Sequence, residues 1–304
     1  MESMGEVLAG IQKRIEKLRT EGPSISSGHQ DSTEDLAPKK SGSSLATSNE
    51  GCEKCNYTGT INTFKWVQPE GYPIPYQVAS VELCSCHYER QFNKYNAAET
   101  FSAKEKEYTF KNAIIDDNNL AHYTTAIDFV RDVKRHMGEG TWLYIFGDEV
   151  RAADVSKEKG FTLEAYGTGK TYLMQCMANA FSLRKIPALY VTEETLFSDI
   201  KATYNRDSDE SEADILNRYY NVPILMIDDI FSASYKEWAE GKLFSILDER
   251  QKKSKVTIMT SNYAIGRIPL RLPLNGGKIA SRIRGQAEMI EMIGSDRRST
   301  KRPA

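Results

Sequence analysis

The sequence predicts an α/β protein in which a parallel sheet is covered by helices on both faces and follows a small cysteine-bearing unit. Two observations support this fold class. From about residue 107, short apolar strands alternate with helices at the pace that is typical of a parallel sheet. Before that point, four cysteines form two closely spaced pairs, which is a pattern typical of a metal site.

Length and composition are those of an ordinary globular protein. The 304 residues allow one large domain or two modest ones, with 40% hydrophobic and 27% charged residues. The net charge of -2 excludes a wholly basic nucleic-acid binder and an acidic tail. No apolar run reaches the roughly 18 residues of a membrane span, and residues 1–20 lack the apolar region of a secretory signal. We therefore expect a cytoplasmic protein with no membrane partner.

The near-zero net charge hides two segments of opposite sign. Residues 205–249 carry 11 acids and 4 bases, a local charge of -7, whereas residues 267–302 carry 9 bases and 3 acids, a local charge of +6. This segregation is compatible with an anionic partner at one place. Solvated helix faces explain the same charges equally well.

The chain is expected to begin with a tethered helix. Within residues 1–20, five apolar residues fall on one stripe of a helical period, and Glu21, Gly22 and Pro23 end the pattern. Residues 21–51 contain eight serines and no aromatic residue, so they predict a flexible linker. The helix is too short to be stable alone in water, and it is expected to dock on this protein or on a partner.

Residues 52–106 are expected to form a zinc-binding unit. Cys52 and Cys55 are two residues apart along one turn, and Cys84 and Cys86 supply a second pair, which completes the four ligands of a tetrahedral Zn²⁺ site. His87 is an alternative to Cys86 as the fourth ligand. Five aromatic residues lie between the pairs and are expected to form the unit's own core, with stacking on nucleic-acid bases as the alternative: Tyr57, Phe64, Trp66, Tyr72 and Tyr76.

Residues 107–304 carry the alternating pattern of the larger domain. Helices are expected at 121–136, 171–183, 211–220 and 239–252, and strands at 142–146, 188–191, 223–227 and 255–259. Each expected strand is a short apolar run, and each helix shows a longer amphipathic period. The fifth cysteine, Cys176, falls on the second of these helices and is expected to be part of the core.

A phosphate-binding loop precedes the second helix. In such a loop, backbone N–H groups at Gly167, Thr168 and Gly169 wrap the phosphates of ATP, Lys170 reaches the β- and γ-phosphates, and the hydroxyl of Thr171 coordinates Mg²⁺. The helix that follows adds the positive end of its dipole. The sequence therefore predicts a nucleotide site at this loop.

The loop is interrupted. Its pattern requires a first glycine at position 164, where the chain has Glu164, and no strand lies immediately upstream. When residues 149–165 are set aside, Gly147 and Asp148 join Tyr166 to complete the motif directly after the strand 142–146. We infer a 17-residue insertion, which either loops out and leaves the site intact, displaces the strand and weakens nucleotide binding, or is removed before the mature protein exists.

Two further strand ends complete the expected ATPase site. The strand 223–227 is followed by Asp228, expected to hold Mg²⁺ through water, and by Asp229, expected to polarise the attacking water. Asn262 follows the next strand and is expected to orient water near the γ-phosphate.

The order of these motifs resembles the AAA+ helicase loaders of the DnaC/DnaI type over roughly residues 50–300. The resemblance implies an AAA+ P-loop ATPase preceded by a zinc unit that binds helicase. It also implies roles for Asn262 as sensor 1, for Arg282 as an arginine finger acting on a neighbouring subunit, and for Arg297 or Arg298 as sensor 2. A finger acting in trans requires an ATP-dependent homo-oligomer. The aspartate at position 229, where many AAA+ proteins have glutamate, predicts slow hydrolysis.

These expectations lead to one principal function and two alternatives. The principal reading is loading of a replicative hexameric DNA helicase onto single-stranded DNA, with ATP, Mg²⁺ and Zn²⁺ bound. Lys252, Lys253, Lys255 and the basic tail are candidate contacts to DNA phosphates. One alternative is a transposition ATPase of the IstB type, although the cysteine unit argues against it. The other is a non-catalytic adaptor whose nucleotide site the insertion disables.

Overall fold

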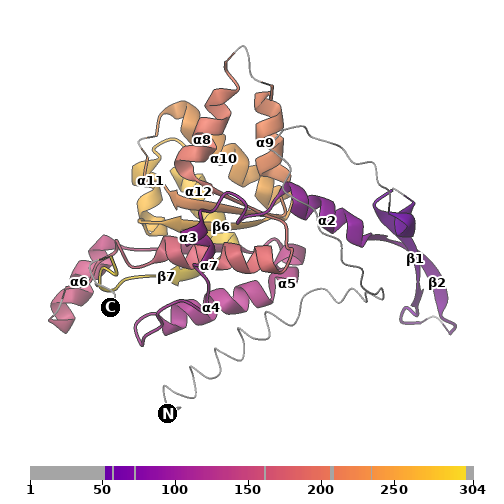
Figure 1. Ribbon diagram of the computed structural model, residues 1–304, viewed down its shortest axis with the longest axis horizontal. Coiled ribbons are helices and arrows are strands. Elements are labelled where there is room, and N and C mark those ends of the chain that lie inside the picture. The colour runs from indigo at the N-terminus through magenta and orange to yellow at the C-terminus, as the bar shows by residue number, and fades with distance from the viewer. Residues whose placement is uncertain are drawn as a thin grey trace, which may run out of the picture. The chain divides into compact units, whose positions relative to one another are not determined.

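The computed structural model describes residues 52–56, 58–71, 73–160, 162–205, 209–233 and 235–298. The chain divides into two compact units with a boundary between Gln91 and Phe92, and each unit is described by itself (Figure 1). The predicted helix 1–20 and linker 21–51 lie outside the described residues. None of the helices in the described part of the chain is both long and apolar enough to cross a membrane.

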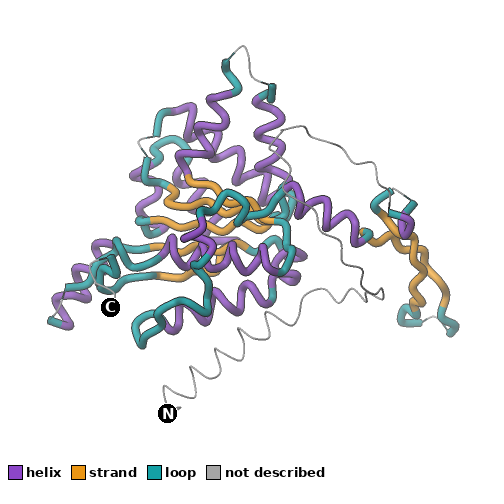
Figure 2. Tube along the Cα trace, viewed as in Figure 1, coloured by secondary structure: helices purple, strands orange, loops and turns teal. Residues whose placement is uncertain are grey.

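The first unit is a cysteine-bearing turn followed by a hairpin and the start of a helix. A 3₁₀ turn, η1 (Glu53–Cys55), precedes strands β1 (Thr60–Val67) and β2 (Tyr76–Leu83), which pair antiparallel from Thr60 opposite Leu83 to Val67 opposite Tyr76. Helix α2 (Ser85–Lys94) begins directly after Cys84, and Figure 2 shows the hairpin as a long two-stranded ribbon.

The aromatic residues of this hairpin do not form a core. Phe64 is 66% exposed and Trp66 is 67% exposed, and Tyr76 is also exposed. The expectation of an internal aromatic core is therefore wrong for these three residues. The physical reason is that a two-stranded ribbon has two faces and, among the described residues, no second layer packs on either of them. Tyr57 and Tyr72 lie outside the described residues.

The second unit begins earlier than the predicted boundary at residue 107. Ala97, Ala98 and Phe101 are buried in the core of this unit, so the segment after Phe92 belongs to it. The short helix α3 (Ala103–Lys106) continues this segment, and Ser102 caps it with a reciprocal bond to Glu105. Packing on the larger core thus decides the boundary, which the cysteine spacing alone did not reveal.

A five-stranded, wholly parallel sheet organises the second unit. Its strand order is β4-β5-β6-β3-β7. The strands are β3 (Trp142–Phe146), β4 (Ala188–Thr192), β5 (Ile224–Ile230), β6 (Val256–Ser261) and β7 (Ala287–Glu291). The first four were predicted within a few residues. The edge strand β7 was not, because it carries two glutamates and has no apolar run.

Helices cover both faces of the sheet, as predicted. Figure 1 shows α4, α5 and α7 on one face and α8, α9, α10 and α12 on the other, and a separate apolar cluster fills each side. The helices are α4 (Leu120–Arg131), α5 (Val133–Glu139), α6 (Glu149–Lys159), α7 (Lys170–Leu183), α8 (Glu193–Ala202), α9 (Glu212–Asn221), α10 (Glu237–Lys252), η2 (Ile265–Arg267), α11 (Ile268–Arg271) and α12 (Gly276–Gln286).

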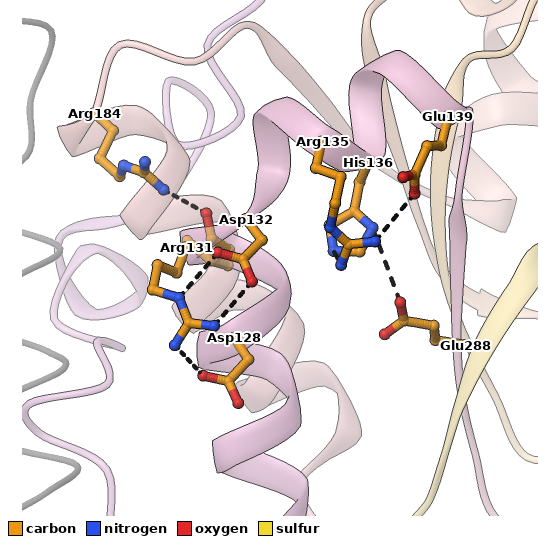
Figure 3. Close-up of polar contacts among 9 residues, drawn as sticks. Asp128, Arg131, Asp132, Arg135, His136, Glu139, Arg184 and Glu288 are labelled. Atoms are coloured by element: carbon orange, nitrogen blue, oxygen red, sulfur yellow. Dashed lines mark hydrogen bonds and ion pairs between the residues drawn. The ribbon is translucent and has the colours of Figure 1, made fainter.

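The predicted helix 121–136 breaks into α4 and α5 at Asp132. Arg131 forks across the break, with Nε 2.9 Å from Oδ1 of Asp132 and a terminal nitrogen 2.6 Å from Asp128 (Figure 3). Because this guanidinium lies against it, the pKa of Asp132 is held below its usual range. One turn later, the buried ring of His136 stacks on Phe129. These contacts hold α4 and α5 to each other.

One buried cation also joins the layers. The guanidinium of Arg250 is fully buried and donates to the backbone carbonyls of Tyr219 (2.7 Å), Val222 (2.9 Å) and Val256, and to the hydroxyl of Thr257 (2.9 Å). Burial lowers its pKa to about 9. These bonds tie the end of α9 to the start of β6.

Candidate functional site

The predicted nucleotide site lies at the carboxyl ends of the central strands. β3 leads into Gly147, β5 carries Asp228, and β6 leads into Asn262. The backbone N–H of Gly147 donates to the carbonyl of Ser261 at 3.0 Å, so the ends of β3 and β6 are held together. In open parallel sheets, this edge is where ligands bind.

The phosphate loop has the backbone that its glycines allow. Gly167 has φ of +67° and Gly169 has φ of +99°, in the left-handed region that favours glycine. Helix α7 begins at Lys170, directly after this turn, so its first N–H groups face the loop. The hydroxyl of Thr168 is buried and has no hydrogen-bond partner among the described residues. A glycine turn at the N-terminus of a helix, with an unpaired hydroxyl beside it, fits an anionic ligand.

Lys170 is held inside the loop. Only 8% of the residue is exposed, and its Nζ donates to the carbonyl of Ala165 at 2.6 Å. Burial lowers the pKa of Lys170 to about 8, and the nearby carboxylates of Asp229 and Asp228 oppose that shift. The ammonium group is therefore poised for a phosphate to complete its charge pairing.

The insertion is folded, and its ends meet. Residues 149–159 form α6, which Asp148 caps at its start by accepting from the N–H groups of Val150 and Arg151. At the other end, a side chain at Gly147 would lie 2.4 Å from the carbonyl oxygen of Ala165. The chain thus leaves the end of β3 and returns to it, so Gly147 lies against the residue that precedes Tyr166. Figure 1 shows α6 projecting from this edge of the sheet.

Asp228 gathers three hydroxyl groups. It is 5% exposed, and it accepts from Thr171 at 3.2 Å, from Tyr190 at 2.7 Å and from Thr260. The structure therefore brings the loop hydroxyl of Thr171 directly against the strand carboxylate. These two oxygen ligands are of the kind that Mg²⁺ prefers.

Asp229 and Asn262 also lie together. The side-chain amide of Asn262 donates to Oδ1 of Asp229 at 2.8 Å, and the hydroxyl of Ser232 donates to the same oxygen at 2.8 Å. Asp229 has φ of +55°, an unusual backbone for a residue with a side chain, and its N–H donates to Thr260 at 2.8 Å. The carboxylate is held beside the buried Asp228 but remains exposed to solvent.

Of the predicted arginines, Arg282 lies apart from this cluster. On α12 it forms an ion pair with Asp248 of α10, and its guanidinium lies 4.6 Å from the ring centroid of Phe244. Both charged side chains are mostly covered. The contacts described for Arg282 are all with α10 and α12, and none is with the phosphate loop of its own chain.

Arg297, from the C-terminal segment, contacts the phosphate loop. Its backbone N–H donates to the carbonyl of Gly167 at 3.0 Å, and its guanidinium pairs with Asp116 at 2.7 Å. Arg298 is close enough for its charge to lower the pKa of Lys170. The carboxylate of Asp296 packs against Gly167, where a side chain would clash at 2.0 Å. Both candidate sensor 2 residues are thus brought to the loop.

Sequence reasoning missed several partners of these groups. Tyr190 and Thr260 bond to Asp228, and Asp116 pairs with Arg297 from 181 residues away. Thr260 carried a signal, because it stands at the end of a predicted strand beside the one that bears Asp228. Asp116 carried none, since no local pattern links it to the chain terminus.

Of the three lysines proposed for DNA contact, Lys252 and Lys253 pair with side chains of the same chain. Lys252 pairs with Asp248 at 2.7 Å and with Glu249 at 3.1 Å. Lys253 donates to Asn221 at 3.0 Å. Lys255 is half-buried, and burial lowers its pKa. The basic tail after residue 298 lies outside the described residues.

The four cysteines of the first unit form one cluster. Their sulfur atoms all lie within 4.8 Å of one another, with 3.6 Å between Cys52 and Cys84 and 3.5 Å between Cys55 and Cys86. Four thiolates around a zinc ion, each at about 2.3 Å, lie roughly 3.8 Å apart. A hydrogen bond from the backbone of Cys86 lowers the pKa of Cys84, whereas desolvation raises the pKa of Cys86, as expected when closely packed sulfur atoms share protons. The donor set and spacing therefore fit zinc with Cys86, and not His87, as the fourth ligand.

Comparison with known proteins gives matches in DNA replication. The family described as the bacterial DnaA ATPase domain matches residues 150–285. The replicative helicase loader DnaC of Buchnera aphidicola subsp. Baizongia pistaciae is 34% identical over 96 residues, 32% of this chain and 39% of that protein. The initiator protein DnaA of Limosilactobacillus reuteri (strain DSM 20016) is 27% identical over 193 residues, 59% of this chain and 41% of that protein. The chain thus spans about two fifths of these relatives.

A solved structure of DnaI matches the fold. It has a TM-score of 0.50 and 23% identity, and the match covers 68% of this chain and 99% of that one. At this identity the match establishes the fold alone, which is the AAA+ fold with its parallel sheet flanked by helices. The DnaC relatives and the DnaI fold confirm the predicted resemblance to the DnaC/DnaI type.

Proposed function

We propose that this chain, whose AAA+ module is similar to those of DnaC and DnaI, is an ATP-dependent loader of a replicative hexameric DNA helicase. One observation carries the proposal: a nucleotide site of AAA+ type and a four-cysteine unit with an exposed apolar hairpin occur in the same chain. The first supplies an ATP-dependent switch, and the second supplies a surface for a protein partner. The setting of this function is the cytoplasm of a bacterial cell.

The nucleotide would bind across the phosphate loop. Lys170 would exchange the carbonyl of Ala165 for the β- and γ-phosphates, and Thr171 with Asp228 would hold Mg²⁺, which supplies charge neutralisation on the phosphates. Asp229, held by Asn262, would accept a hydrogen bond from the attacking water. Aspartate is shorter than glutamate by one methylene, so we expect slow turnover, which suits a switch.

The cysteine unit would bind the helicase. A Zn²⁺ ion held by the four thiolates would fix the turn that carries β1 and the helix that follows β2. The hairpin between them has three charged residues, Lys65, Glu70 and Glu82, and the first and last of these pair with each other at 3.0 Å. A hairpin whose one basic residue is paired with Glu82 is a poor site for a polyanion, so its exposed aromatic residues favour a protein partner over DNA.

Assembly side by side would complete the site. Arg282 would leave Asp248 and reach the nucleotide of a neighbouring subunit as an arginine finger, and Arg297 would contact the γ-phosphate within its own subunit. The resulting homo-oligomer would contact single-stranded DNA as the helicase is delivered. These roles rest on the resemblance and on the positions described above.

The experiment combines helicase capture with ATP turnover. The full chain is expected to co-purify with the hexameric replicative helicase of its host and to hydrolyse ATP slowly, whereas Lys170→Ala is expected to lose turnover but keep the helicase. Arg284→Ala is a matched control, because Arg284 is exposed on α12. A chain that captures helicase but never binds ATP would be an adaptor. A chain that captures a transposase and duplex DNA instead would be a transposition ATPase.

A further inference from the structure

The insertion in the phosphate loop, residues 149–165, consists of helix α6 and a returning segment, and we call it the arm. Helix α6 ends at Gly160, which has the left-handed backbone of a helix terminus, and the chain then turns back along the helix. The hydroxyl of Ser156 accepts from the N–H of Leu163 at 2.7 Å, and Ala165 at the end of the arm is 1% exposed. The returning segment is thus pinned to its own helix and to the module.

This arm holds the C-terminal segment at two points. Glu164 and Gly294 form an antiparallel bridge, with N–H to carbonyl distances of 2.7 and 3.0 Å in the two directions. On α6, the Nε atom of Arg151 lies 2.9 Å from the carboxylate of Glu291, the last residue of β7. The two contacts lie three residues apart on the C-terminal segment and hold it on one side of the loop.

The same segment delivers Arg297 to the phosphate loop. Three residues after the bridge at Gly294, the N–H of Arg297 donates to Gly167, and its Cδ lies 3.7 Å from the position of a side chain at Gly169. The arm also ends at Ala165, whose carbonyl accepts from Lys170. The insertion therefore contacts Lys170 directly and reaches Arg297 through Gly294, three residues earlier on the same segment.

We propose that residues 149–165 are a positioning element that fixes Arg297 beside the γ-phosphate of bound ATP. The inference rests on the proposed function, because it requires that the loop bind ATP. Without the arm, segment 292–298 keeps its bonds to Phe146, Gly167 and Asp116 but loses the bridge. Arg297 then contacts the γ-phosphate in a smaller fraction of molecules. The insertion thus adds to nucleotide recognition instead of only being tolerated.

The test compares affinities for ATP and ADP, since only ATP has the γ-phosphate. Equilibrium titration of the full chain with fluorescent ATP and ADP analogues gives the ATP-over-ADP preference. We expect deletion of 149–165 to lower this preference about fivefold or more, as expected when hydrogen bonds that hold a group are lost. Arg297→Ala is expected to lower it similarly, and to add less than about twofold in the deletion background.

A charge reversal tests the same contact without removing any chain. Arg151→Glu is expected to lower the preference a few-fold, and the added change Glu291→Arg is expected to restore it. Lys157→Glu is the matched control, because Lys157 also lies on α6 and the ion pair described for it is with Asp154 of the same helix. Circular dichroism and thermal melting identify any variant that fails to fold, and the reversal pair then decides.

The outcomes separate the inference from the function. A wild-type chain that binds neither nucleotide contradicts the proposed function. A wild-type chain without preference for ATP, a deletion that keeps the preference, or an Arg297→Ala effect that is undiminished in the deletion overturns the positioning role and leaves the proposed function standing. Rescue by the double reversal, with an unchanged Lys157 control, supports it.

Discussion

In the AAA+ module, two apolar clusters sandwich the sheet, whereas the cysteine unit buries only Cys55 and Cys84 among the hydrophobic residues whose burial the structure describes. Close apolar packing holds the AAA+ module. The cysteine unit has a cluster of four cysteine side chains in place of an apolar core. The difference teaches that exposed aromatic residues mean different things in the two regions. A module with a full core has no need to expose them, while a hairpin without a second layer presents Phe64 and Trp66 on its surface.

The largest effect is expected from a substitution that disrupts the cysteine unit alone. Cys55→Ser is expected to lose one zinc ion per chain and to unfold the hairpin, because structural zinc contributes on the order of 10 kcal/mol to such units. Zinc is measured by atomic absorption, and hairpin order by hydrogen exchange. Cys176→Ala is the control, since Cys176 is buried in helix α7 of the other unit and is not one of the four clustered cysteines. Retention of zinc by Cys55→Ser would refute the hypothesis that the four cysteines hold the metal ion.

The next largest effect is expected on the free energy of unfolding of the AAA+ module. Arg250→Met removes the donor that satisfies the carbonyls of Tyr219, Val222 and Val256 inside the core. Leaving these groups buried and unpaired is expected to lower the free energy of unfolding by about 3–5 kcal/mol. Urea unfolding measures this change. Arg284→Met, at an exposed position, is expected to stay within about 0.5 kcal/mol.

A smaller effect is expected on the pH dependence of ATP affinity, through the buried cation Lys170 at the predicted phosphate site. Phosphate binding requires protonated Lys170, whose pKa burial lowers to about 8. Affinity for ATP is therefore expected to be constant below pH 8 and to weaken as pH rises above it, approaching tenfold per pH unit. Titration of ATP affinity from pH 6.5 to 9.5 measures this dependence.

The matched variant for this dependence is Lys170→Arg. A guanidinium keeps its charge over the whole range, so any affinity that this variant retains should not change with pH between 7 and 9. An identical decline in both proteins would assign the dependence to another group.

The smallest effect on stability is expected for a substitution on the exposed face of the hairpin, which tests partner binding separately from folding. Trp66→Ser changes a side chain that is 67% exposed, so the free energy of unfolding should move by less than about 0.5 kcal/mol. Helicase capture should nevertheless weaken, because the apolar contact is lost. Val78→Ser, opposite Lys65 on the other face of the ribbon, is the control. Equal losses for both variants would show that the two faces do not differ.

The sequence predicted best what depends on local pattern. Apolar runs located β3, β4, β5 and β6, and Asp228, which follows the predicted run 223–227, lies beside Thr171. The edge strand β7 was missed because edge strands need little apolar surface. The interruption of the phosphate loop was visible as a broken motif, but the folding of that segment into α6 was not, since its composition is polar.

What the sequence could not show depends on contacts between distant segments. The pairing of Glu164 with Gly294, and that of Arg297 with Asp116, join positions more than a hundred residues apart without any local signature. The aromatic residues of the hairpin were misread because alternation of aromatic and polar residues describes a half-buried strand, and only the absence of a second layer among the described residues exposes them.

The contact between Gly147 and Ala165 has a consequence for how such a protein evolves. A segment whose two ends touch can be gained or lost in a single genetic event without redirecting the chain on either side, because the flanking elements keep their places. Once present, it supplies an outward-facing helix joined to the glycine turn of the phosphate loop. Substitutions on that helix would then tune nucleotide preference while leaving every residue of the original loop unchanged.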